Sequence, residues 1–202
     1  MRKSIFLLAA LAGAALASCC GGDGDGGSNS EAAIETIMTR TSIRAFTDRE
    51  VTGETIETLL RAGMAAPSAV NRQPWAFVVV SGRENLDRLA AVHPTARMLT
   101  TAQAAIVVCG DMTKALEGSA REYWVQDASA ATENILLAAH ALGLGAVWTG
   151  VYPNEERVAA VAEVLELPSY IVPLCVIPMG YPAENPSPKD KWNPQNVHYG
   201  KW

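Results

Sequence analysis

The chain has 202 residues, enough for one domain of ordinary size, and 49% of them are hydrophobic, so it can bury a substantial core. Its formal net charge is -5, and removal of a leader with the two cations Arg2 and Lys3 would lower this by two, to -7. This balance argues against a nucleic-acid surface and leaves room only for a local basic pocket, such as one that binds a single phosphate.

The N-terminus has the pattern of an export signal. Arg2 and Lys3 precede an apolar run over residues 5–17, which is shorter than the roughly 20 residues that a spanning helix needs. Residues 15–17 fit an A-x-A cleavage site, which would release a soluble protein. Residues 16–19 instead resemble the bacterial lipobox, in which Cys19 is lipidated and becomes the first mature residue.

We favour the lipobox because a polar, glycine-rich spacer follows Cys19 at once. We therefore expect a signal peptide over residues 1–18, a flexible tether over 19–30 and one folded domain over 31–202. This predicts an exported protein of the cell envelope, anchored through lipid on Cys19 to a bacterial membrane that faces the periplasm or the surface.

The first half of the domain predicts helices that alternate with short strands. Apolar residues at helical spacing over 34–38 begin the folded part. A clearer apolar stripe over 56–64 follows, with Thr52 as its N-cap and Pro67 just beyond its end. The apolar, β-branched residues 75–80 predict a buried strand.

Residues 81–84 have the spacing of a capping box and predict a helix that turns Leu86 and Leu89 inward. A second strand is expected over residues 104–109. The longest helix is expected over about 122–142, and it is apolar on nearly all sides from residue 128 onward. Such a helix is buried, often against a second subunit.

Gly143 and Gly145 end the long helix, and a third strand is expected over residues 146–151. Asn154 caps a helix with an apolar stripe over 158–165.

The fourth strand, over residues 170–179, contains Pro173 and Pro178, which favour an edge or a bulged position. The tail that follows has few apolar residues and is expected to lie across something else. This mixed order of helices and strands suits a sheet covered by helices on both faces.

Cys109 and Cys175 each lie in an apolar run that predicts a strand, and we interpret them as buried small hydrophobes. Export would permit a disulfide between them, which the sequence does not decide. No cysteine or histidine spacing is typical of a zinc site, so we expect no metal.

Four clusters of polar residues are candidates for ligand binding. The first combines two guanidinium groups with two hydroxyls, the donors that suit a phosphate, although charged clusters are more often solvated surface. The second offers hydrogen-bond donors and acceptors on a loop that two prolines stiffen. These groups either bind a planar heterocycle or merely satisfy the backbone of the turn. The clusters are Arg40, Thr41, Ser42 and Arg44, then Pro67, Ser68, Asn71 and Gln73.

The third cluster, Trp148, Thr149 and Gly150, follows the long helix, and its glycine permits close approach of a ligand to the backbone. The fourth, Lys189 and Lys191, lies near the chain end, where lysines are usually solvated but can complete a phosphate pocket. No G-x-G-x-x-G fingerprint of a dinucleotide fold is present.

Together these clusters resemble the nitroreductase family. The resemblance runs from about residue 34 to 202, and the matching segments come in the family's order at residues 40–46, 66–75, 143–150, 178–182 and 197–199. It implies an α+β fold, a three-layer α/β/α sandwich with a mostly antiparallel sheet, in an obligate homodimer with FMN at the subunit interface.

The resemblance also implies site roles. Arg40, Ser42 and Arg44, with Thr41 beside them, bind the phosphate and ribityl groups, and Lys189 or Lys191 helps. Pro67, Ser68, Asn71 and Gln73 either reach the flavin from the other subunit or frame its edge. The backbone near Trp148, Thr149 and Gly150 hydrogen-bonds the isoalloxazine. No side chain is nominated as a catalytic acid or base, because the cofactor does the chemistry.

The implied activity is ping-pong hydride transfer from NAD(P)H through FMN to a small aromatic acceptor, nitroaromatic or quinone-like. Two features depart from the family. Lys191 stands where many relatives have arginine, and a lysine does not fork around a phosphate. Export would also remove the protein from cytoplasmic nicotinamides, so either the physiological donor is another molecule or the export interpretation is wrong.

Two alternatives remain open. A lipid-tethered protein with this fold would hold FMN or another planar ligand without nicotinamide-driven turnover. A family offshoot would carry out other flavin chemistry, such as reductive dehalogenation or flavin fragmentation.

Overall fold

The computed structural model describes residues 26–202, so the predicted signal peptide over residues 1–18 and the predicted lipid on Cys19 lie outside the described residues. The helices are α1 (Gly26–Thr39), α2 (Gly53–Met64), α3 (Arg83–Val92), α4 (Tyr123–Ala141) and α5 (Glu155–Val164). The strands are β1 (Trp75–Ser81), β2 (Ala104–Asp111), β3 (Gly145–Ala146), β4 (Thr149–Gly150) and β5 (Ile171–Gly180). The 3₁₀ turns are η1 (Ala69–Asn71), η2 (Arg97–Thr100), η3 (Gly118–Glu122) and η4 (Pro194–Asn196).

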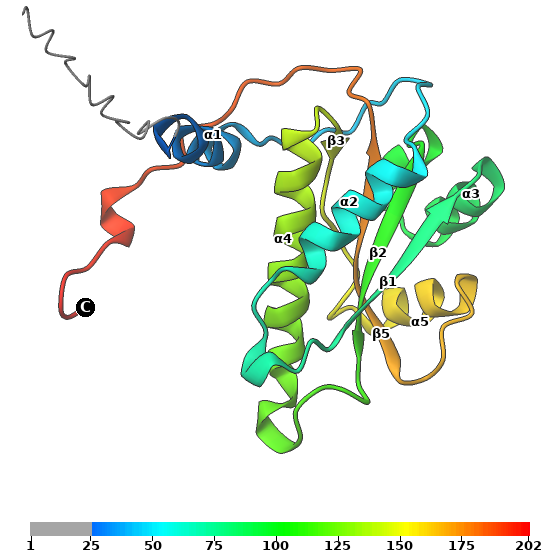
Figure 1. Cartoon of the computed structure of the whole chain (residues 1–202). Coiled ribbons are helices and arrows are strands. Elements are labelled where there is room, and N and C mark those ends of the chain that lie inside the picture. The colour runs from blue at the N-terminus through cyan, green and yellow to red at the C-terminus, as the bar shows by residue number, and fades with distance from the viewer. Residues whose placement is uncertain (1–25) are drawn as a thin grey trace, which may run out of the picture.

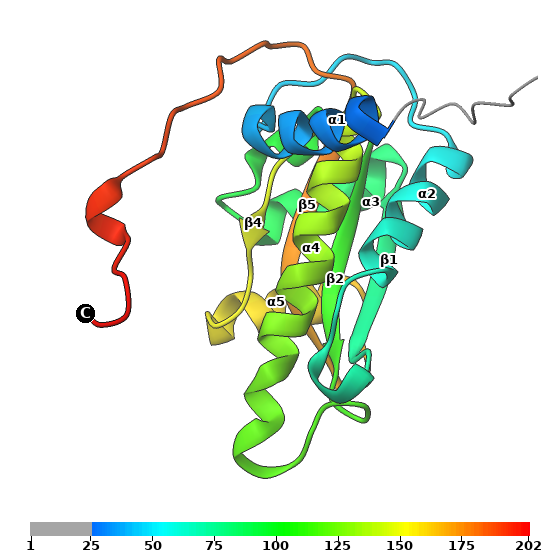
Figure 2. The same cartoon turned by 60° about the vertical axis from the view of Figure 1, so that its left-hand side comes forward.

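The fold is the expected α+β sandwich. Its five-stranded sheet has the order β1-β2-β5-β3, with β4 also pairing with β5, and every pairing is antiparallel. Helices α2 and α4 cover one face of the sheet, and α3 and α5 cover the other (Figures 1 and 2). No helix in residues 26–202 is long and apolar enough to cross a membrane.

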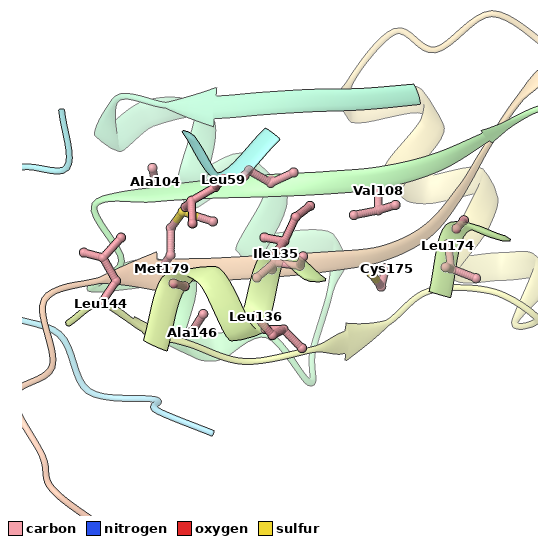
Figure 3. Packing of buried hydrophobic residues seen from close by; sticks show 14 of the residues in the cluster. Leu59, Ala104, Val108, Ile135, Leu136, Leu144, Ala146, Leu174, Cys175 and Met179 are labelled. Atoms are coloured by element: carbon pink, nitrogen blue, oxygen red, sulfur yellow. The ribbon is translucent and has the colours of Figure 1, made fainter. Parts of the chain in front are cut away.

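Strand alternation divides the core into two layers. Ile106 and Val108 of β2 belong to the layer under α2 and α4, which also contains Leu59 of α2 and Ile135 of α4. Figure 3 shows Val108, Leu59 and Ile135 in this layer. The neighbours of Ile106 and Val108 on β2 point the other way, toward α3 and α5. All eight residues of β2 are buried, so this strand and β5 beside it form the centre of the fold.

The two described cysteines lie in different layers. Cys175 packs in the cluster under α4, whereas Cys109 packs in the cluster under α3 and α5. Both are free, and burial raises the pKa of each thiol to about 12. The interpretation as buried small hydrophobes is confirmed, and the structure holds no disulfide between them.

Most predicted elements are confirmed within one or two residues, including two helix caps. Thr52 accepts a hydrogen bond from the Thr55 amide at 3.3 Å, and Asn154 accepts one from the Arg157 amide at 2.8 Å. The capping box over residues 81–84 is wrong. Ser81 is the last residue of β1, paired with Ala104, so its side chain caps nothing and α3 begins after Gly82.

The third predicted strand differs from the structure, and of the two options for the fourth strand the bulge is confirmed. The third strand is two short strands, β3 and β4, because residues 147 and 148 leave the ladder. Strand β5 is central and not an edge. Pro173 is tolerated because the register of β5 shifts beside it and leaves Leu174 as an extra, unpaired residue. This arrangement is a β-bulge, the second of the two positions that the prolines favoured.

Helix α1 is longer than the apolar pattern over residues 34–38 indicated, and its apolar residues are exposed. It begins at Gly26, within the expected flexible tether over 19–30, since a helix that has formed over later residues extends at little cost. Its apolar residues Ile34, Ile37 and Met38 are 61%, 55% and 69% exposed. One chain therefore leaves this stripe uncovered.

Gly145 lets residue 43 approach β3. The Ile43 amide donates to the Ala146 carbonyl at 3.1 Å, and a Cβ on Gly145 would lie 2.5 Å from Cγ2 of Ile43. Ile43 is only 8% exposed and packs against Phe46 and Ala102. The absence of a side chain at Gly145 thus sets the position of the segment that carries Arg40 and Arg44.

Gly145→Ala is expected to destabilise the fold by about 1–3 kcal/mol, because the new methyl group must displace the buried Ile43 side chain. Urea denaturation measures the change. Gly53→Ala is the matched control, since a Cβ there meets nothing within 4 Å, and it should shift stability by no more than about 0.5 kcal/mol. Equal midpoints for Gly145→Ala and the wild-type chain would contradict this packing argument.

Candidate functional site

A pocket of about 690 Å³ opens between the end of α1, residues 40–44, α4 and the C-terminal tail. Its volume lies in the range of small-molecule sites. It joins the first and fourth candidate clusters, which lie about 150 residues apart in sequence. The lining residues are Ile37, Met38, Arg40, Thr41, Ser42, Arg44, Glu133, Pro186, Ser187, Lys189, Asp190, Lys191 and Trp192.

Contacts to α4 orient Arg40. The Nε of Arg40 lies 3.4 Å from Oε1 of Glu133, and the arginine side chain is only 18% exposed. One residue earlier, Oγ1 of Thr39 lies 2.9 Å from Nε2 of His140, a hydrogen bond between the end of α1 and the last turn of α4. Both contacts tie the start of the pocket segment to the long helix.

Backbone pairing holds the rest of the segment. Besides the bond from Ile43 to Ala146, the Thr47 amide donates to the Tyr181 carbonyl at 2.8 Å, and the Ala183 amide donates to the Ala45 carbonyl at 2.9 Å. Phe46 forms a bridge with Pro182. Residues 43–47 therefore lie between β3 and the chain that leaves β5, and this arrangement brings the tail to the arginines.

The lining suits the phosphate end of FMN. It contains four basic side chains, those of Arg40, Arg44, Lys189 and Lys191, and two acidic ones. The basic excess of two matches a phosphate group, which carries about -1.5 to -2 charges at neutral pH. Thr41 and Ser42 add hydroxyl donors. The donor set present thus fits the group that the resemblance implies.

The second cluster lies on a loop with a constrained backbone. Val70, Asn71 and Gln73 have φ values of 51°, 54° and 50°, a region that side chains, above all β-branched ones, disfavour. Oγ of Ser68 accepts from the Gln73 amide at 3.0 Å, and Oδ1 of Asn71 accepts from Nε2 of Gln73 at 3.0 Å. Pro67, Asn71 and Gln73 are exposed.

This loop does not reach the pocket within one chain. Oδ1 of Asp127 on α4 accepts from the Ala69 amide at 2.8 Å, and Asp127 is 7% exposed. Glu133, the α4 residue in the pocket, lies about 120° from Asp127 around the helix axis at 3.6 residues per turn. One chain therefore presents the first and second clusters on different faces of α4.

The third cluster continues from β3 along the edge of the sheet. Oγ1 of Thr149 donates to the Val176 carbonyl at 2.7 Å, so this hydroxyl is already satisfied and buried. Nη1 of Arg157 donates to the Gly150 carbonyl at 2.7 Å. Trp148 is half-buried, and a Cβ on Gly150 would meet nothing within 4 Å, so open space lies beside this backbone. None of the three residues lines the pocket.

His93, His198, Tyr123 and Trp124 all lie outside the pocket lining. His93 is fully buried, and burial lowers its pKa below the usual value. His198 stacks on Trp202 in the tail at a centroid distance of 4.0 Å. Trp124 is 3% exposed and packs edge-on against Tyr152, so it belongs to the core, whereas Tyr123 is 47% exposed and lines a separate pocket of about 310 Å³.

Three acidic residues near the clusters escaped the sequence interpretation. Glu133 orients Arg40, Asp127 holds the second loop, and Glu184 accepts hydrogen bonds from the backbone amides of Arg44 and Ala45. Asp127 and Glu133 carried a signal, because a charged residue is unexpected in a mostly apolar helix. Glu184 carried none. Within residues 26–202, no three histidine, cysteine or acidic side chains gather as a metal site would require.

Comparison with known proteins identifies the fold and its relatives. The family model described as "Nitroreductase family" matches residues 37–94 and 89–181. A curated protein of Methanothermobacter thermautotrophicus, named "Putative NADH dehydrogenase/NAD(P)H nitroreductase", is 49% identical over 84% of this chain and 87% of its own length.

Solved structures agree. One of the same name from Bacteroides thetaiotaomicron is 48% identical, has a TM-score of 0.80, and is matched over 85% of this chain and 98% of that one. The NADPH:FMN oxidoreductase of Vibrio harveyi, complexed with NAD+, is 29% identical with a TM-score of 0.76, over 85% and 78% of the two chains.

Proposed function

This chain belongs to the nitroreductase family, and we propose that it is an FMN-dependent oxidoreductase that reduces nitroaromatic or quinone-like acceptors with electrons from NAD(P)H. The observation that carries the proposal is the pocket that gathers Arg40, Arg44, Lys189 and Lys191 around two hydroxyls. Relatives named as an FMN reductase and an NADPH nitroreductase support the choice of cofactor and donor.

The roles of this chain's residues follow from their positions. Arg40 and Arg44 would grip the phosphate as planar forks, Thr41 and Ser42 would donate to it, and the tail lysines would close over it as point charges. The backbone near Trp148, Thr149 and Gly150 would face the ring, since open space lies beside Gly150. When bound, FMN accepts two electrons from the nicotinamide and passes them to the acceptor in two alternating half-reactions.

We further propose that the functional unit is a homodimer. The apolar stripe of α1 is exposed, and the tail runs away from the body (Figure 2), with every residue from 182 to 202 exposed to solvent. A second copy would cover both, in keeping with the rarity of large apolar patches on monomers. Its residues Pro67, Ser68, Asn71 and Gln73 would then reach the ring, which the same residues of the first copy do not approach.

A second candidate function is that of a lipid-tethered flavin-binding protein without nicotinamide-driven turnover. The export pattern of residues 1–19 favours it, because the nicotinamide pool is cytoplasmic. Lipid on Cys19 would hold the chain at a bacterial membrane, facing the periplasm or the surface. Labelling with palmitate tests the anchor. Incorporation of the label by the wild-type chain but not by Cys19→Ala supports the anchor, and equal labelling of the two chains refutes it.

Neutralising the two arginines together is expected to weaken FMN binding at least 100-fold, because two charge-assisted contacts to the phosphate are lost. Quenching of flavin fluorescence on titration measures the affinity of Arg40→Gln/Arg44→Gln. The matched control is Arg88→Gln/Arg97→Gln, which makes the same charge change at exposed arginines outside the pocket. Unchanged FMN affinity in the pocket variant would exclude the proposed phosphate site.

Turnover separates the two candidate functions. The purified, flavin-loaded chain is expected to lose its visible flavin absorbance when NADPH is added without oxygen, and to recover this absorbance when a quinone follows. A yellow protein that neither NADPH nor NADH bleaches favours the tethered binding protein. A colourless protein that takes up no FMN contradicts both candidates.

Ile34→Asp is expected to shift the chain from dimer to monomer in sedimentation velocity, because it places a charge in the apolar stripe proposed as interface and lies outside the pocket lining. FMN affinity should fall in parallel, since the second copy supplies part of the site. Tyr170→Asp introduces the same charge at an exposed aromatic residue away from α1 and should leave the dimer intact. A wild-type chain that sediments as a monomer would refute the dimer.

A further inference from the structure

A short antiparallel strap joins the pocket segment to the root of the tail. Residues 44–47 and 181–184 pair through the bonds from Thr47 to Tyr181 and from Ala183 to Ala45, with the bridge from Phe46 to Pro182 between them. The guanidinium of Arg49 stacks on the Tyr181 ring at 3.6 Å from its centroid. Figure 1 shows the tail leaving the body beyond this point.

Glu184 is the last residue of the strap. Its Oε1 accepts from the Arg44 amide in a short hydrogen bond and from the Ala45 amide at 3.1 Å. A carboxylate that receives two backbone donors makes charge-assisted bonds, which are stronger than neutral ones. After Glu184, no helix or strand holds the described chain until the single turn η4, so the strap sets the direction in which Lys189 and Lys191 leave the body.

We propose that Glu184 is a positioning residue for phosphate recognition, an inference that rests on the proposed flavin function. Its carboxylate holds the backbone of Arg44 on one side and the root of the lysine-bearing tail on the other. The two sources of positive charge thereby meet across one pocket. Glu184 touches neither cofactor nor substrate in this role and acts through Arg44, Lys189 and Lys191.

The sign of the effect separates positioning from simple electrostatics. As a negative charge beside an anion pocket, Glu184 should repel phosphate, so its removal would tighten FMN binding if charge alone mattered. If it positions the arginine and the tail, removal weakens FMN binding, and the isosteric Glu184→Gln, whose amide oxygen still accepts hydrogen bonds, preserves more affinity than Glu184→Ala.

The test compares FMN with riboflavin, which lacks the phosphate, on the full chain. Glu184→Ala is expected to bind FMN about tenfold more weakly than the wild-type chain and riboflavin equally well, with Glu184→Gln between them. Glu117→Ala, which removes an exposed carboxylate outside the pocket, is the control and should change neither affinity. Equal losses for both ligands would reduce Glu184 to a general structural role, and tighter or unchanged FMN binding would overturn the proposal.

A second readout needs no flavin. Hydrogen exchange at the backbone amides of Arg44 and Ala45 is expected to be several-fold faster in Glu184→Ala than in the wild-type chain, because both amides lose their acceptor. Equal exchange rates would count against the strap even if the wild-type chain bound no FMN. Loss of all flavin binding by the wild-type chain would instead refute the proposed function, so the two failures are distinguishable.

Discussion

The placement of residues 43–47 between two other parts of the chain determines the site. On one side the Ile43 amide donates to Ala146 of β3, an approach that only glycine permits at position 145. On the other side residues 181–183 pair with the same segment as the chain leaves β5. Because β3 pairs with β5 and the tail continues from β5, the positions of the arginines and of the tail both depend on this buried, central strand.

One chain builds only half of the proposed flavin site. The phosphate end is complete in its donors, whereas the loop over residues 67–73 is held by Asp127 on a different face of α4. Exposure of the α1 stripe and of the tail to water raises the free energy of an isolated chain. A second copy that covers both would lower this free energy. The same geometry thus accounts for an incomplete site and an uncovered apolar surface.

Local patterns predicted most of the fold, because helix caps and apolar stripes act over a few residues. Thr52, Asn154 and the stripe of α2 were readable in this way. Long-range strand pairing could not be predicted from local sequence. Ser81 has the spacing of a capping residue but pairs with Ala104 as part of β1. Pro173 is compatible with an edge strand, but a bulge allows it to lie in the central strand β5. Of the site, the four clusters were visible from residue types, whereas the contacts of Glu133 and Glu184 depend on chain crossings that no local pattern encodes.

The central claim is that one copy holds the flavin phosphate and its twin completes the ring end. A crystal structure of the full chain grown with FMN tests it most directly. The phosphate is predicted to contact Arg40 and Arg44 of one copy, with the loop over residues 67–73 of the other copy beside the ring. A phosphate bound away from these arginines, or a flavin enclosed by a single chain, would contradict the claim.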